Sequence, residues 1–297
     1  MKKLFLLSIG LLMAVTIFAQ SIKVTPALKK GMNKTYTNTT AITTMEQTIN
    51  IVSEQHFSIT KETPQGYEML IETTNYSSDA KDDNLAGRLL TLGTEILKDT
   101  KAQVSLNKEG KLLDIINYEE IKTKCLASGE RMVDELLKAA PEISQVLTKE
   151  ALVEQVAATL TRENLIKSLA GNSNPLALFG LTIVNGMQDK YNNGMLDLKR
   201  TWLVNGKKIF ASAKSDMSKE ELKAYVLSQV EKLAPQQADM IKENIDMVLS
   251  SGLIKIDVTE NANYELADDL WIKAMETTVE NDMMGQKTSS STKIQQK

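Results

Sequence analysis

An alternating stretch near the end of the chain, residues 253–278, constrains the fold more than any other feature. It reads LIKIDVTENANYELADDLWIKAMETT and is broken once, at Ala267-Asp268-Asp269. Its apolar positions form three registers: Ile254, Ile256 and Val258, then Tyr264 and Leu266, then Leu270, Ile272 and Ala274. A period of two is typical of half-buried strands, because successive side chains point to opposite faces. We therefore expect two antiparallel strands here, with Asp268-Asp269 in a turn and not a catalytic dyad.

The same alternation recurs in three earlier segments, at 47–77, 103–116 and 195–214. The first contains Thr63-Pro64-Gln65-Gly66, where Pro and Gly suit a β-turn. The last contains Asn205-Gly206, a strong short hairpin signal. These repeated hairpins predict one antiparallel sheet built from distant pieces of the chain.

Two Thr- and Ser-rich segments are further strand candidates. Residues 34–44 are rich in Thr, a β-branched residue that favours strands. Residues 286–295 are rich in Ser, Thr and Lys, which favours an edge strand or a frayed tail.

Helical periodicity separates the hairpins in three places, near 84–98, 118–171 and 218–251. Thr148 and the capping box Ser218-Lys-Glu-Glu221 are suited to begin helices. The predicted fold class is α+β: a curved, half-barrel-like antiparallel sheet with amphipathic helices packed on or over one face. No linker divides the chain, so we expect a single domain over 20–297.

The segment Leu176–Val184 does not follow either period. It reads LALFGLTIV and lies between Pro175 and Asn185-Gly186. It can be a fully buried strand or an apolar loop covering a cavity, and the sequence leaves both open.

The N-terminus has the anatomy of a secretory signal peptide. Lys2 and Lys3 precede an apolar run from Leu4 to Phe18, and Ala19 offers a cleavage point. The run is shorter than the roughly 20 residues that span a bilayer. We therefore expect residues 1–19 to be removed, leaving an exported chain in the periplasm or outside the cell, with no transmembrane span.

Composition argues against several classes of function. The formal charge of −3 offers no basic surface for nucleic acid. Cys125 is the only cysteine and His56 the only histidine, so neither an intramolecular disulfide nor a multi-histidine zinc site can form. We expect Cys125 in the core and His56 on the less buried side of its strand.

The sequence predicts no catalytic, cofactor-binding or metal-ligating residues. It contains no GxSxG, HExxH, phosphate-loop or dinucleotide motif. The acidic group Asp79, Asp82 and Asp83 lacks calcium-loop spacing and fits the N-terminal end of a helix better. Trp202 and Trp271 are expected in the core, with pocket lining as the alternative.

Methionine-rich helices over a curved sheet can enclose an apolar cavity. With the signal peptide, the hairpin order and the segment Asn263–Lys273, the chain resembles secreted bacterial, periplasmic families of uncharacterised function. It also resembles half-barrel lipoprotein carriers, whose curved sheet is lidded by helices over a lipid-binding cavity. The resemblance concerns architecture, so it assigns no functional residue.

The leading hypothesis is therefore an exported, non-enzymatic cell-envelope protein that binds an apolar, lipid-like ligand or a protein partner. One alternative is a structural or interaction protein of the envelope without a small-molecule ligand. Another is a hydrolase using dispersed carboxylates such as Glu72, Asp114 and Asp257, which would have to meet in one cleft.

Overall fold

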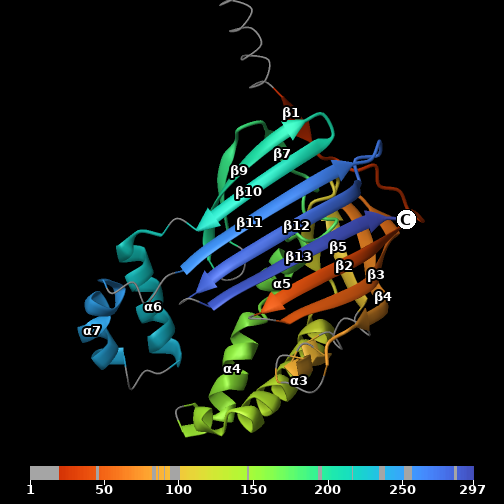
Figure 1. Cartoon of the computed structure of the whole chain (residues 1–297). Coiled ribbons are helices and arrows are strands. Elements are labelled where there is room, and N and C mark those ends of the chain that lie inside the picture. Colours follow the sequence, from red (N-terminus) through yellow and green to blue (C-terminus); the bar gives the residue numbers. More distant parts are fainter. Residues whose placement is uncertain are drawn as a thin grey trace, which may run out of the picture.

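One large antiparallel sheet dominates the computed structural model, which describes residues 20–44, 47–81, 85, 87–89, 91–93, 101–145, 147–192, 196–215, 217–233, 238–250, 256–283 and 286–297 (Figure 1). Its strands in these parts of the chain are β2 (Asn33–Thr44), β3 (Gln47–Thr63), β4 (Gly66–Ser78), β5 (Lys101–Asn107), β6 (Leu112–Ile115), β8 (Gln188–Asn192), β9 (Asp197–Asn205), β10 (Lys208–Ser215), β11 (Ile256–Leu266), β12 (Ile272–Met283) and β13 (Gln286–Gln296). A separate pair is formed by β1 (Ser21–Lys23) and β7 (Thr182–Val184).

The strand order explains how distant segments become one sheet. It runs β6-β5-β4-β3-β2-β13-β12-β11-β10-β9-β8, so the first and last parts of the chain meet where β2 pairs with β13. The sheet is open, with β6 and β8 as its edges. The prediction of one sheet built from hairpins, in an α+β fold, is confirmed.

Two details of the predicted strands are wrong. The strand 286–295 is not an edge or a tail, because β13 lies between β2 and β12 in the middle of the sheet. In β11 a single register, not two, runs from Ile256 through to Leu266, with every second residue buried. Ala274 does not share the face of Ile272, because the pairing with β11 shifts at Leu266 and Lys273 becomes the extra residue.

The helices follow the predicted insertions. They are α3 (Tyr118–Ala139), α4 (Lys149–Thr159), α5 (Arg162–Leu169), α6 (Lys219–Leu233) and α7 (Ala238–Ser250), with a 3-10 turn at Pro141–Gln145. Thr148 caps α4, and Ser218 and Glu221 exchange the two hydrogen bonds of a capping box at α6. Of the predicted helix 84–98, only 85, 87–89 and 91–93 are described, and they are helical. The predicted signal peptide lies outside the described residues.

One face of the sheet, here called the covered face, carries the main core. It bears Trp202, Ile209, Tyr264 and Met275, all nearly fully buried. Helix α5 and the segment that follows it pack onto this core, while α3 packs against α4 and α6 against α7 (Figure 1). Among the described residues, no helix combines the length and apolar character needed to cross a membrane.

Candidate functional site

The segment Leu176–Val184 fills part of the covered face and determines where a site can lie. It is a series of turns ending in β7, whose partner is β1. Leu178 and Ile183 are 0% exposed and Phe179 is 3% exposed. Neither of the two predicted alternatives, a fully buried strand or an apolar loop covering a cavity, describes this segment. The turns bury their side chains in the sheet's apolar core, so the space beneath is occupied by the chain itself.

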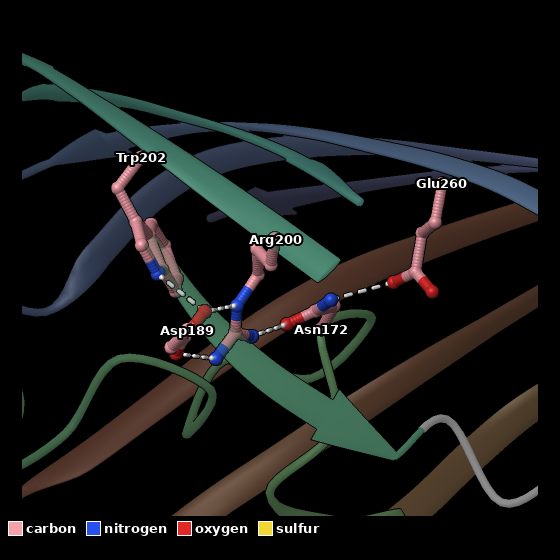
Figure 2. A network of polar contacts seen from close by, with 5 residues as sticks. All are labelled: Asn172, Asp189, Arg200, Trp202 and Glu260. Atoms are coloured by element: carbon pink, nitrogen blue, oxygen red, sulfur yellow. Dashed lines mark hydrogen bonds and ion pairs between the residues drawn. The ribbon is translucent and has the colours of Figure 1, made fainter. Parts of the chain in front are cut away.

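Beside this segment, five side chains form a polar network, shown in Figure 2. Arg200 of β9 faces Asp189 of β8, its register partner. Its Nε and Nη2 donate to the two carboxylate oxygens of Asp189 at 3.0 and 2.7 Å. The Nε1 of Trp202 donates to the same carboxylate at 3.2 Å. Such a bidentate pair is stronger and better oriented than a single contact.

Aromatic rings hold the Arg200 guanidinium in place. Its central carbon lies 4.3 Å from the centroid of the Trp202 ring and 4.6 Å from that of Tyr191. A cation over an aromatic face is stabilised by the negative charge density of the ring. Arg200 is therefore fixed by its carboxylate partner and by two rings.

Asn172 links this ion pair to a second carboxylate. Its Oδ1 accepts from Nη1 of Arg200 at 3.0 Å, and its Nδ2 donates to Oε1 of Glu260 at 2.6 Å. The Asn172 carbonyl accepts from the Tyr264 hydroxyl at 3.2 Å. Asn172 comes from the turn after α5, so the network connects that turn to β8, β9 and β11.

Glu260 is the buried acid of the network, with 5% of its surface exposed. Its Oε1 accepts from Asn172, and its Oε2 accepts from the hydroxyl of Tyr191 through a short hydrogen bond. Both donors are neutral. Burial, followed by the negative charge of Glu260, raises the pKa of Tyr191 well above its ordinary value of 10.0. Burial likewise raises the pKa of Tyr264. Both hydroxyls therefore stay protonated as hydrogen-bond donors.

A cavity of about 530 Å³ opens next to Glu260. Its wall includes Asn172, Tyr191 and Glu260, and its rim includes exposed Lys167 and Ser168 of α5. The sheet supplies its floor, at Val279, Asn281 and Ser290. Most of these side chains are polar.

The cavity floor belongs to a row of cross-strand neighbours on the covered face. Glu260 pairs with Val279, Val279 with Ser290, and Ser290 with Ile42 of β2. Val279 and Ile42 are half-buried. Because neighbouring strands lie about 4.8 Å apart, the row measures about 14 Å between the backbones of β11 and β2. It is charged at one end and apolar at the other, with the polar Ser290 between Val279 and Ile42.

The residues singled out from the sequence lie outside this site, except for Trp202. His56 is half-buried on β3, with its ring nitrogens 2.9 Å from the hydroxyls of Thr35 and Thr74. It lies on the face opposite Phe57, as predicted. Cys125 is half-buried against the main core, and burial raises the pKa of its thiol. Trp271 is fully buried in the core and packs edge-on against Phe179.

The predicted carboxylates are not brought together. Glu72 of β4 forms an ion pair with Lys101 of β5, and Asp114 of β6 forms one with Arg162. Asp257 lies far from both, on β11, which is separated from β4 by four strands. The three proposed hydrolase residues therefore share no cleft.

The acidic turn residues have local structural partners. Asp79 accepts hydrogen bonds from the backbone and side-chain amides of Asn50, so it binds β3. Asp82 and Asp83 lie outside the described residues. Asp268 pairs with Lys207 and Asp269 with Lys34, in the predicted turn. In the described part of the chain, no three His, Cys, Asp or Glu side chains form a group that could hold a metal ion.

Sequence reasoning missed the network, although a signal for it exists. Arg200 lies between Leu198 and Trp202 in the inward-facing register of β9. Glu260 interrupts the inward register of β11 in the same way, between Val258 and Ala262. A charged residue in a run of buried positions needs a partner. Two such interruptions on neighbouring strands point to a buried polar site.

Comparison with known proteins adds little to this geometry. No protein-family model matches the sequence, and no match was found among the curated proteins. Among solved structures, the chain is similar to one described as "Lipid-protein interactions in lipovitellin", with a TM-score of 0.39 and 8% sequence identity. The match covers 91% of this chain and 25% of that one, so the chain spans about a quarter of the length of that protein. A likeness at this level carries no argument about function.

Proposed function

We propose that this chain is an exported, non-enzymatic binding protein of the cell envelope that holds an amphipathic, lipid-like ligand. The ligand's polar group lies in the cavity beside Glu260, and its apolar part lies along Val279 toward Ile42. The observation that carries this proposal is the row from Glu260 to Ile42, which joins a polar cavity to half-buried apolar side chains. The basic and apolar N-terminus supports export.

The filled apolar core limits the ligand to this part of the covered face. Because Leu178, Phe179 and Ile183 occupy the space against the sheet core, a long acyl chain has no room there. The row from Glu260 measures about 14 Å, which is the length of a chain of roughly ten carbons in extended form. Ligands with one short or medium apolar chain therefore fit best.

Binding of simple amphiphiles tests the proposal. Dodecyl maltoside, dodecanoate and dodecylamine have the same chain length and carry a neutral, a negative and a positive head group. Each is titrated into the mature protein below its micelle concentration, and bound species are counted by native mass spectrometry. At least one of the three should bind saturably, with one molecule per chain. If none does, and no bound mass is found on protein isolated from its own envelope, the proposal is wrong.

A matched pair of variants locates the binding. Ser290 faces the cavity, whereas Ser289 is its neighbour on β13 and faces the other side of the sheet. Ser290→Phe should fill the floor of the cavity and abolish binding, while Ser289→Phe should leave binding unchanged. Far-ultraviolet circular dichroism checks that both variants keep the sheet. Equal binding by both variants would place the ligand elsewhere.

A protein partner is the second candidate, and the opposite face of the sheet favours it. Leu203 is 49% exposed there, in a groove of about 520 Å³ that also contains Phe210 and Ala274. An exposed apolar residue in such a groove is a common feature of interaction surfaces. Loss of a cross-linked partner in Leu203→Glu, with amphiphile binding retained, would favour this candidate.

A further inference from the structure

We propose that the cavity beside Glu260 selects a positively charged, amine-bearing head group. This inference rests on the proposed function and specifies the chemical class of its ligand. It follows from the charges around the cavity, from the position of the buried carboxylate and from an acceptor on the cavity floor that has no hydrogen-bond partner among the described residues.

The ion pair of the network leaves Glu260 without a direct counter-charge. Arg200 donates two hydrogen bonds to Asp189 and one to Asn172, so its positive charge mainly offsets the negative charge of Asp189. The amide of Asn172 lies between the guanidinium and Glu260. The network thus contains two carboxylates and one guanidinium. A buried carboxylate is costly unless a cation approaches it.

The cavity is where such a cation can approach. Glu260 forms part of its wall, and each carboxylate oxygen can accept a further hydrogen bond beyond the one it already has. The other charged residue lining the cavity is Lys167, on its rim. Its Nζ forms an ion pair with Oε1 of Glu163 at 2.8 Å. Among the described residues, the charged side chain at the cavity wall that lacks an ionic partner is therefore the carboxylate of Glu260.

Asn281 provides a second, independent indication. It lines the cavity floor, and its Oδ1 is buried with no hydrogen-bond partner among the described residues. Asn281 lies two residues beyond Val279, the direct partner of Glu260, so it is the diagonal neighbour of the carboxylate. Diagonal side chains in a sheet are about 7–8 Å apart at their Cα atoms, within reach of one bridging group. An ammonium group has three donors and no acceptor, so it can bond to both oxygens once the Asn281 side chain turns its buried Oδ1 toward the cavity.

The ranking of three amphiphiles tests this selectivity on the unaltered protein. Dodecylamine should bind at least about tenfold more tightly than dodecyl maltoside, which corresponds to about 1.4 kcal/mol, and dodecanoate should bind most weakly. Isothermal titration calorimetry measures all three. If the neutral or anionic compound binds as tightly as the amine, the head-group inference is overturned while the proposed binding function stands. If none of the three binds and protein isolated from its own envelope carries no bound mass, the proposed function itself is refuted and the inference falls with it.

Variants then assign the preference to the cavity. Glu260→Gln keeps the shape of the side chain, removes its charge and replaces one of its two acceptor oxygens by a donor. It should abolish the preference for dodecylamine over the maltoside. The matched control is Asp257→Asn, which removes one negative charge from the exposed side of the same strand and should leave the preference intact. Asn281→Leu removes the unpaired acceptor and should lower the affinity for dodecylamine relative to that for the maltoside, which gives a second test if Glu260→Gln does not fold. A preference that survives in both Glu260→Gln and Asn281→Leu would overturn the assignment.

Discussion

Replacing Phe179 by alanine would show whether residues 176–184 belong to the core or form a movable cover. Phe179 is 3% exposed, and its ring lies 5.0 Å from that of Trp271 in an edge-to-face arrangement. Truncating a buried phenylalanine removes its apolar surface and leaves a cavity, which costs about 3–5 kcal/mol. Of this, the aromatic pair contributes about 0.5–1.5 kcal/mol. Because domains are stable by roughly 5–15 kcal/mol, the loss would be large.

Urea unfolding followed by tryptophan fluorescence measures this loss, because both tryptophans are fully buried in the folded protein. Leu203→Ala is the control: Leu203 is 49% exposed on the other face, so its truncation should cost less than about 1 kcal/mol. The urea midpoint should fall strongly in Phe179→Ala and little in the control. A loss below about 1 kcal/mol for Phe179→Ala would refute the reasoning, because the segment would then be a cover that lies over accessible space.

Three further predictions concern the network and the sheet. Arg200→Met should lower the free energy of unfolding, measured in urea, by about 2–3 kcal/mol. A double-mutant cycle with Asp189→Leu should give a coupling energy above about 1 kcal/mol. Additive effects of the two substitutions would contradict the bidentate pair. Because the pKa of Tyr264 is raised, its contribution to stability is complete below pH 10.0 and is progressively lost above it. In an alkaline titration the tyrosinate absorbance of Tyr264 should therefore appear only as the sheet unfolds. Comparison with Tyr264→Phe identifies that part of the absorbance. Gly66→Ala should destabilise the protein strongly, because the added Cβ would lie 2.0 Å from the carbonyl oxygen of Leu106. In Gly186→Ala the added Cβ meets no atom within 4 Å, so this control should cost only the strain of its positive φ, about 1–3 kcal/mol. Equal thermal midpoints for the two variants would contradict the prediction.

Much of the fold could be predicted because its signals are local. The Pro64-Gln65 turn and the Asn205-Gly206 turn each join adjacent strands, and the structure has β3 with β4 and β9 with β10 at these places. Turn residues and alternation act over a few positions, so they can be recognised in one sequence. The pairing of β2 with β13 has no such local signal. For this pair of strands the sequence predicts only that they belong to one sheet.

Details that depend on tertiary packing could not be predicted in the same way. The extra residue Lys273 shifts the register of β12, and no turn or breaker residue marks it. The segment Leu176–Val184 was recognised as apolar, but whether apolar residues form a strand or a set of buried turns depends on what surrounds them. Here β1 pairs with β7, and the core of the sheet accepts the turns.

The site itself was the part that sequence reasoning missed, because its members come from four separate segments. Asn172 and Glu260 are 88 positions apart, and Asn172 and Arg200 are 28 apart. Neither contact follows from a motif. The interruptions at Arg200 and Glu260 were visible in the sequence, but their partners could be identified only once the strand order was known.

The cavity explains part of the polar composition of β13. Its Ser and Thr residues suggested an edge strand, since edge strands tend to be polar, yet β13 is central. On the covered face, Ser290 lines the cavity floor, and Thr292 bonds to Thr40 of β2 at 3.1 Å. The neighbouring strand β12 has Thr277, which bonds to Ser173 at 2.9 Å. A central strand facing an apolar core would instead carry branched apolar residues. Small polar side chains in the middle of this sheet are what a strand needs where it lines a polar cavity, so the feature that misplaced β13 is itself an indication of the site.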